Sequence, residues 1–257
     1  MIIDTHAHYD DKAFAEDREE VLSDLAVHGV HRVINSGSSL EACRRTIELM
    51  EQYPFIYGSL GVHPSDTAEL TEEDMDWLAQ QSRLAKCVAI GEIGLDYYWD
   101  EPRRELQKKW FVRQLRLARK VGLPVVIHSR EAAQDTITLM QEERAEEIGG
   151  VIHCYSYSKE SARSFLDMGF YFGIGGVVTF TNGKKLKEVT EYLPMDRILL
   201  ETDCPYLSPV PRRGKRNDSR NLPLVAEEIA RIKGISREEV ERITTGNALR
   251  LYRKLQI

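Results

Sequence analysis

Short runs of β-branched and other apolar residues alternate with longer charged stretches along the whole of this 257-residue chain. Each run is long enough for a strand buried on both faces, and each charged stretch is long enough for an amphipathic helix. A closed parallel barrel has about eight such strand–helix units, so we predict an α/β fold of the TIM (β/α)8 type. The runs lie at Met1–Thr5, Val30–Asn35, Ile56–Leu60, Cys87–Ile90, Pro124–Ile127, Gly150–Ile152, Phe170–Gly173 and Arg197–Leu200.

The helix starts agree with this architecture. Ser38 with Glu41, and Ser236 with Glu239, have the spacing of a capping box, and Thr71 precedes an acidic first turn. An open doubly wound sheet would also alternate strand and helix. It is disfavoured because no G-x-G-x-x-G or Walker-type loop follows the first strand, and because polar residues follow many strands instead of one switch point.

Composition favours a single domain over residues 1–257. The chain is 42% hydrophobic and 30% charged, which suffices for one large core, and no linker or repeat divides it. It has no run of about eighteen apolar residues and no basic leader before Ile2, and its four cysteines have no paired spacing. We therefore expect a cytoplasmic protein with no membrane segment and no obligatory protein partner.

The formal net charge of −6 argues against a general polyanion-binding surface. Two bound divalent cations would bring this balance to about −2. The acidity therefore does not exclude a substrate that carries phosphate.

Two histidines stand at the end of the first apolar run, in the segment Asp4-Thr5-His6-Ala7-His8. Side chains two positions apart on a strand share a face, so His6 and His8 can direct their imidazoles to one point. Two imidazoles that meet in this way are typical ligands of a divalent metal.

Further ionisable residues follow the other predicted strands. A barrel enzyme builds its site at the carboxyl ends of its strands, so these residues are expected to lie together. His28 and His31 instead flank the start of the second strand, on the opposite rim, and we expect them on the surface. The residues at the strand ends are His63, Glu92, His128, His153, Glu201 and Asp203.

Taken singly, these residues have structural explanations. A buried histidine can be satisfied by a backbone carbonyl, and Glu92 or Asp203 can cap a helix or pair with a cation. Together they predict a metal centre, because burying so many ionisable groups at one end of a barrel is costly unless a cation neutralises them. Four imidazoles and two carboxylates exceed the needs of one tetrahedral zinc and fit two ions that share a carboxylate. The ligands would be His6, His8, Glu92, His128, His153 and Asp203.

Two cysteines adjoin proposed ligands. If His153 points inward, strand alternation turns Cys154 away from the site. We therefore expect Cys154 and Cys204 to be structural.

A basic loop and an aromatic run lie close to the predicted ligands. The loop follows the eighth strand and is stiffened by prolines, so we expect its cations to bind phosphate. The aromatic run follows the fourth strand and can stack on a base, although aromatic residues are as often packing. The loop cations are Arg212, Arg213, Lys215, Arg216 and Arg220, and the aromatic residues are Tyr97, Tyr98 and Trp99.

The motifs, in this order, resemble the TatD family of metal-dependent deoxyribonucleases, which belongs to the amidohydrolase-like barrels. They extend to Gly246-Asn247-Ala248 and are Asp4-Thr5-His6-Ala7-His8, Gly61-Val62-His63-Pro64, Gly91-Glu92-Ile93-Gly94-Leu95-Asp96-Tyr97, Ile127-His128-Ser129-Arg130, His153-Cys154 and Leu200-Glu201-Thr202-Asp203-Cys204-Pro205-Tyr206-Leu207. The resemblance implies a TIM barrel whose two metals hydrolyse DNA phosphodiesters, with the family's ligand positions on the six residues named above.

Three residues depart from the family pattern. Tyr9 replaces the leucine that commonly follows the H-x-H motif, and Tyr155 and Tyr157 replace the phenylalanine and glycine of an H-C-F-S-G stretch. None is a proposed ligand. We expect them to alter the rim and thereby the substrate shape.

We thus predict a metal-dependent deoxyribonuclease, in particular an exonuclease acting on single-stranded ends. His6, His8 and Asp203 would hold one ion, His128 and His153 the other, and Glu92 would bridge them. Asp203 can also act as base, while Glu201 and His63 would orient ligands or touch phosphate. Imidazole–carboxylate sites accept Mg, Mn, Zn or Fe. The alternatives are a deacylase acting on an aminoacyl-nucleotide or another ester on the same barrel, and a non-catalytic interaction protein.

Overall fold

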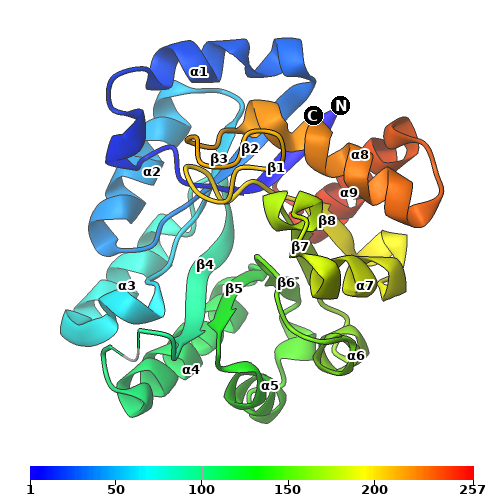
Figure 1. Ribbon diagram of the computed structural model, residues 1–257. Helices are drawn as coiled ribbons and strands as arrows, with labels where there is room; N and C mark the ends of the chain where they lie inside the picture. The colour runs from blue at the N-terminus through cyan, green and yellow to red at the C-terminus, as the bar shows by residue number, and fades with distance from the viewer. Residues whose placement is uncertain (100) are drawn as a thin grey trace.

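All eight predicted strands form, and they pair in chain order in one parallel sheet. The computed structural model describes residues 1–99 and 101–257 and shows this sheet curved into a barrel with helices around it (Figure 1). The predicted TIM barrel is confirmed, and the open doubly wound sheet is excluded. The strands are β1 (Ile2–Ala7), β2 (Val30–Ser36), β3 (Ile56–Ser59), β4 (Cys87–Asp96), β5 (Val125–Arg130), β6 (Gly150–Ile152), β7 (Tyr171–Ile174) and β8 (Ile198–Leu200).

The segment after β8 closes the barrel against β1. Ala7 and Cys204 form a parallel bridge. The amide of Asp203 donates to the carbonyl of His6 at 2.9 Å, and the amide of His8 donates to that of Cys204 at 2.8 Å. The closure therefore brings His6 of β1, and His8 directly after β1, beside Asp203.

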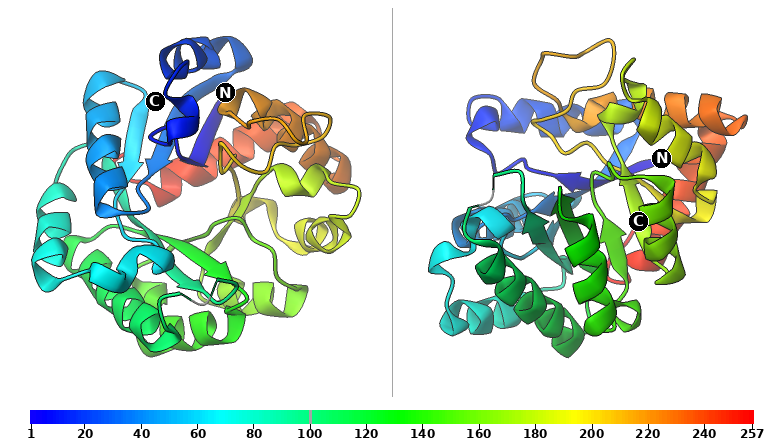
Figure 2. Two further views of the ribbon diagram at one scale, coloured as in Figure 1. Left: turned by 60° about the vertical axis from the view of Figure 1, so that its left-hand side comes forward. Right: turned by 60° about the horizontal axis from the view of Figure 1, so that its bottom comes forward.

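Helices cover the outside of the barrel, as the two further views in Figure 2 show. No helix in residues 1–99 and 101–257 is long and apolar enough to span a membrane. The helices are α1 (Arg18–Asp24), α2 (Leu40–Gln52), α3 (Glu72–Gln81), α4 (Arg104–Val121), α5 (Ala133–Glu142), α6 (Lys159–Asp167), α7 (Lys184–Tyr192), α8 (Leu222–Lys233) and α9 (Arg237–Leu251).

The predicted helix starts are capped at α3 and α9, but the capping box predicted for α9 forms only on its Ser236 side, because the Glu239 carboxylate accepts hydrogen bonds from Arg242 instead. Thr71 forms a full capping box with Asp74 at α3, and the Ser236 hydroxyl accepts from the amide of Glu239 at α9. At α2 the cap is Ser39, one residue later than Ser38, because it is the Ser39 hydroxyl that accepts a hydrogen bond from the first turn.

Two strands run further than the apolar pattern predicts. β4 continues to Asp96 and β5 to Arg130, whereas the apolar runs stop at Ile90 and Ile127. The extensions carry polar side chains that face the site, so their hydropathy does not mark them as strand. The proposed ligands Glu92 and His128 consequently lie within strands instead of after them.

Side chains from all eight strands fill the barrel interior in a layer that packs against Tyr252, just after α9. Val126, Val151 and Leu199 belong to this layer. His128 lies two positions further along β5, and His153 and Glu201 directly follow the last residues of β6 and β8, each two positions after a residue of this layer. Side chains two apart on extended backbone share a face. The polar site thus lies directly above the apolar filling, at the carboxyl end of the barrel.

Candidate metal centre

His6 and His8 meet at one point, as the H-x-H spacing predicts. Their Nε2 atoms are 3.1 Å apart. Nδ1 of His8 lies 2.8 Å from the carbonyl oxygen of Ser36, so this nitrogen carries a proton and Nε2 is the ring atom that faces the site. Oδ1 of Asp203 lies 3.4 Å from Nε2 of His8 and 3.8 Å from Nε2 of His6.

The Glu92 carboxylate stands between two sets of imidazoles. Its Oε2 lies 3.3 Å from Nε2 of His6 and 3.7 Å from Nε2 of His8. Its Oε1 lies 2.8 Å from Nδ1 of His128 and 3.1 Å from Nε2 of His153. A carboxylate that offers one oxygen to each set has the arrangement that a bridging ligand between two ions requires.

Two other carboxylates lie behind the imidazoles that face Glu92. Oδ2 of Asp96 is 3.0 Å from Nε2 of His128 and fixes the ring with Nδ1 toward Glu92. Oε1 of Glu201 accepts the amide hydrogen of Cys154 at 2.5 Å and lies 3.5 Å from Nδ1 of His153. Both carboxylates are buried.

His63 lies at the edge of the same cluster. Its Nδ1 accepts the amide hydrogen of Ser65 at 3.2 Å, which places the proton of the neutral ring on Nε2. Nε2 is 3.8 Å from Oε1 of Glu92, so His63 also forms a ligand-like group with Glu92 and His128. The predicted role in orienting ligands or touching phosphate stays a prediction.

The imidazoles determine the charge states of the carboxylates. Burial by itself raises the pKa of Glu92, but the neighbouring imidazoles, with His153 first, hold this pKa well below its usual range. Burial also raises the pKa of Asp203, and the hydrogen bond with His8 and the other imidazoles more than reverse this. Burial, followed by repulsion from a neighbouring imidazole, lowers the pKa of His63 to about 3. At neutral pH these carboxylates are therefore ionised and His63 is neutral. Burial by itself lowers the pKa of His8, but neighbouring carboxylates outweigh burial and raise this pKa to about 9, and they also raise the pKa of His128 and of His153, so a bound cation would replace protons on these imidazoles.

Two glycines make room for this cluster. Gly94 has φ +146° and pairs with His128 across β4 and β5, where an added Cβ would overlap the backbone carbonyl of that histidine. An added Cβ on Gly173 of β7 would overlap the carboxylate of Glu201. Neither position accepts a side chain without displacing the cluster.

The residues fit a divalent cation. Nitrogen and carboxylate oxygen donors suit Mg, Mn, Fe or Zn. Three overlapping groups have ligand atoms within 4.8 Å of one another, namely His6, His8 and Asp203, then His6, Glu92 and His153, and then His63, Glu92 and His128.

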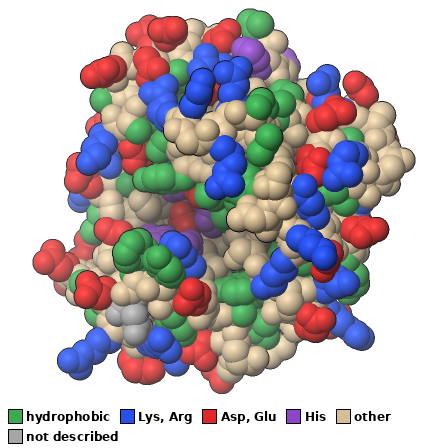
Figure 3. Space-filling model, in the orientation of Figure 1, with side chains coloured by type: hydrophobic (Ala, Val, Ile, Leu, Met, Phe, Trp, Pro, Cys, Tyr) green, Lys and Arg blue, Asp and Glu red, His purple; other side chains and the backbone are tan. Residues whose placement is uncertain are grey.

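The cluster forms the floor of a cavity of about 1160 Å³. Figure 3 shows histidine and acidic side chains at the bottom of this hollow. Four cations that the sequence analysis gave no role border the cavity, together with Trp99. These cations are Lys12, Arg18, Arg45 and Arg130.

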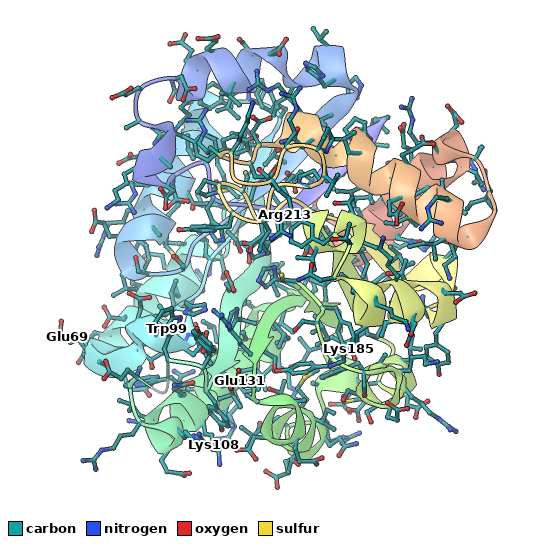
Figure 4. All side chains as sticks on the ribbon, viewed as in Figure 1. Glu69, Trp99, Lys108, Glu131, Lys185 and Arg213 are labelled. Atoms are coloured by element: carbon teal, nitrogen blue, oxygen red, sulfur yellow. The ribbon has the colours of Figure 1, made fainter. Side chains whose placement is uncertain are left out.

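The predicted phosphate-binding loop does not border the cavity in this structure, and two of its cations are held by carboxylates. Arg216 makes bidentate contacts of 2.6 and 2.7 Å with Asp17, and Arg220 contacts Asp218 at 2.9 Å. The Arg213 guanidinium lies 3.9 Å from the ring centroid of Phe180 (Figure 4). Phosphate binding by Arg212, Arg213, Lys215, Arg216 and Arg220 stays a prediction.

The three predicted stacking residues differ in exposure. Tyr97 is buried, donates a 2.6 Å hydrogen bond to Asp135 and has the Arg104 guanidinium over its ring, so it anchors the loop. Tyr98 is 50% exposed and Trp99 is 64% exposed. These two rings alone have faces that a ligand can reach.

The argument that strand alternation turns Cys154 away from the site is wrong. β6 ends at Ile152, and Cys154 has φ 46° and borders the cavity. Burial raises the pKa of the Cys154 thiol. The described part of the chain contains no ligand-like group with Cys154 or Cys204.

The three departures from the family pattern lie away from the cavity wall. Tyr9 is buried, and its hydroxyl donates to Ser219 at 2.8 Å. Tyr155 is buried, and the hydroxyl of Tyr157 lies 2.9 Å from that of Ser129. The expected change of the rim and of the substrate shape stays a prediction.

Asp96 and Arg130 are functional candidates that the sequence analysis left without a role. Asp96 is four positions after Glu92, and Arg130 is two positions after His128. Residues an even number of positions apart on a strand share a face. Both residues could therefore have been predicted on the same face as the proposed ligands, if β4 and β5 had been predicted to continue beyond their apolar runs.

Fold and site together are those of a metal-dependent hydrolase. The family model described as TatD related DNase matches residues 3–253. The chain therefore belongs to the TatD family.

Relatives cover almost the whole chain. This chain is 46% identical over 253 residues to YabD of Bacillus subtilis, which is described as an uncharacterized metal-dependent hydrolase. The match covers 98% of this chain and 99% of YabD. YcfH of Escherichia coli, described in the same words, is 35% identical over 256 residues, which cover 98% of this chain and 96% of YcfH. The crystal structure of YjjV, a TatD homolog from Escherichia coli, matches with a TM-score of 0.92 at 31% identity and 98% coverage of both chains.

Proposed function

We propose that this protein is a deoxyribonuclease that hydrolyses phosphodiester bonds at single-stranded DNA ends. The observation that carries the proposal is the position of Glu92, whose two carboxylate oxygens face two different sets of imidazoles on the floor of an open cavity. The family description as DNases supports phosphodiester bonds as the substrate class.

His6, His8 and Asp203 would hold one divalent ion, His128 and His153 the other, and Glu92 would contact both. When bound, such ions polarise a phosphoryl oxygen and lower the pKa of water, which is the chemistry that phosphodiester hydrolysis needs.

The chain's own residues supply orientation and proton transfer. Asp203 borders the cavity, and its lowered pKa keeps it ionised, so it can accept a proton from the attacking water. Ser36, Asp96 and Glu201 hold His8, His128 and His153 in position. Fixed rings lose no rotational freedom when the substrate binds.

Phosphate groups next to the scissile bond require cations. We propose that Arg130 and Lys12 on the cavity wall provide them, and that Arg212, Arg213 and Lys215 extend this contact on the loop after β8. Arg216 and Arg220 would then hold the loop through their ion pairs.

We place this activity in the cytoplasm. The cysteines in the described residues, Cys43, Cys87, Cys154 and Cys204, are all free thiols, which suits a reducing compartment.

A comparison of substrates tests the proposal. Metal-loaded protein is incubated with end-labelled single-stranded DNA, with RNA of the same sequence and with an aminoacyl ester, each with and without EDTA. Shortening of the DNA that EDTA abolishes is the expected result. Cleavage of the ester without cleavage of either nucleic acid would instead make the protein a metal-dependent esterase.

A further inference from the structure

The turn after β4 presents two aromatic rings at the mouth of the cavity. Tyr98 and Trp99 are 50% and 64% exposed, and their ring centroids are 4.9 Å apart at an interplanar angle of 88°. Trp99, which is labelled in Figure 4, borders the cavity. The chain leaves much of the apolar surface of these two rings uncovered, and a flat ligand can cover it.

Arg130 completes this group. Its guanidinium lies 3.8 Å from the ring centroid of Tyr98, and it borders the cavity as well. Within the part of the chain that the structure describes, no carboxylate pairs with Arg130, whereas Arg216 and Arg220 are both paired. The Arg130 cation is therefore available to an anionic ligand. Tyr98, Trp99 and Arg130 are called the rim shelf below.

The strand register ties the rim shelf to the metal centre. Oδ1 of Asp96 accepts the amide hydrogens of Tyr98 and Trp99, at 3.0 and 3.3 Å. Oδ2 of the same carboxylate holds His128 at 3.0 Å. Asp96 and Arg130 are also opposite each other in the backbone register of β4 and β5, without an ion pair between their side chains. One carboxylate thus fixes the aromatic turn relative to a proposed ligand.

We propose that the rim shelf binds one unpaired nucleotide next to the bond that is cleaved. Trp99, supported by Tyr98, stacks on the base, and Arg130 binds the phosphate of that nucleotide. This inference rests on the proposed function and specifies its substrate. A base within a duplex has both faces covered by its neighbours, so the rim shelf selects frayed or single-stranded ends. Stacking uses the face that every base has, so the selection is independent of sequence.

Binding of a non-cleavable ligand tests the rim shelf apart from catalysis. The probe is a single-stranded phosphorothioate hexanucleotide, either intact or with an abasic residue at one end, titrated against metal-loaded protein by fluorescence anisotropy. Wild type should lose on the order of tenfold in affinity when the base at one particular end is missing. Trp99→Ala should bind the intact probe about tenfold more weakly and show no further loss with the abasic probe, whereas Trp99→Phe should stay within about threefold of wild type.

The arginine is tested by its salt dependence. Arg130→Ala should weaken the binding of both probes equally and reduce the slope of log affinity against log salt by about 0.7, the value for one phosphate contact on a single strand. Tyr192→Ala and Arg163→Ala serve as matched controls, because Tyr192 is a similarly exposed tyrosine, Arg163 is an exposed arginine, and neither borders the cavity. Both controls should bind like wild type.

The outcomes distinguish a failure of the rim-shelf proposal from a failure of the proposed function. If wild type cleaves DNA but Trp99→Ala binds both probes as wild type does, the proposal that the rim shelf binds a nucleotide is overturned, and the proposed function stands. If metal-loaded wild type neither binds nor cleaves any DNA, the proposed function fails, and the rim-shelf proposal fails with it.

Discussion

Asp96 and His128 are joined by a 3.0 Å contact between Oδ2 of the carboxylate and Nε2 of the imidazole. The two residues face each other because β4 and β5 stay paired beyond their apolar parts, with Gly94 opposite His128. The contact directs Nδ1 of the histidine to Glu92, 2.8 Å away. A residue outside the proposed ligand set thus determines how one proposed ligand is presented.

Replacing Asp96 should weaken metal binding without unfolding the barrel. In Asp96→Asn the side chain keeps its shape but has only one carbonyl oxygen. That oxygen cannot accept both the amide hydrogens of the turn after β4 and a hydrogen bond from His128, so metal affinity should fall by about 10- to 100-fold. Competition with a chromophoric chelator measures this affinity, and circular dichroism checks the fold. Asp66→Asn is the matched control, because Asp66 borders the cavity but is exposed and belongs to no ligand-like group. Equal affinities in the two variants would remove Asp96 from the metal centre.

Replacing Asp203 should separate chemistry from folding. Asparagine retains one oxygen but accepts no proton near neutral pH, so Asp203→Asn should fold and bind DNA, yet lose about a hundredfold or more in kcat. Turnover per folded molecule and melting temperature are measured on one preparation. A normal kcat with a lowered melting temperature would mean that Asp203 has only a structural role.

The barrel was predictable because its strands are short apolar runs, separated by helices with recognisable caps such as Thr71. The same reliance on hydropathy placed the end of β4 too early, since the strand continues through Glu92 to Asp96 with polar side chains toward the cavity. The proposed metal ligands could be predicted from the sequence because the carboxyl ends of the strands meet at one rim of the barrel, however far apart they are in the chain.

Contacts between loops were not predictable in this way. Arg216 meets Asp17 across 199 residues of sequence, and no local periodicity connects a loop to a distant helix start. The sequence therefore predicted a loop of unpaired cations after β8, whereas two arginines of this loop form ion pairs with carboxylates in the structure.

Substitutions in this loop should distinguish phosphate contacts from ion pairs. Arg213→Ala should weaken DNA binding at all sequences and reduce the salt slope by about 0.7 for a single strand. Arg216→Ala should leave the salt slope unchanged and lower stability by about 1 kcal/mol or less, as expected for a partly exposed ion pair. Asp17→Ala should reproduce this stability change. A reduced salt slope in Arg216→Ala would show that DNA displaces the ion pair.

The pairing of Glu228 should make stability depend on pH in the acidic range. Hydrogen bonds from Arg231, supported by Lys187, lower the pKa of Glu228 from 4.5 to about 2. Because the folded-state pKa is the lower one, the stabilisation is complete above about pH 4.5 and is lost as the pH falls from there toward 2.

Glu228→Gln should therefore unfold more easily than wild type at neutral pH, by about 1 kcal/mol, and this gap should narrow below about pH 4. Urea unfolding of both proteins across this range measures the gap. The neighbouring exposed Glu227, changed to Gln, is the control and should show no gap at any pH. A constant gap for Glu228→Gln would contradict the lowered pKa.

The most direct measurement of the central claim is the metal dependence of DNA hydrolysis, with the number of ions counted on the same protein. Protein stripped with EDTA should be inactive on end-labelled single-stranded DNA and should regain activity as about two divalent ions bind per chain, with Glu92 between them. DNA hydrolysis that continues undiminished after the metal is removed, or a chain that binds no divalent ion at micromolar concentration, would contradict it.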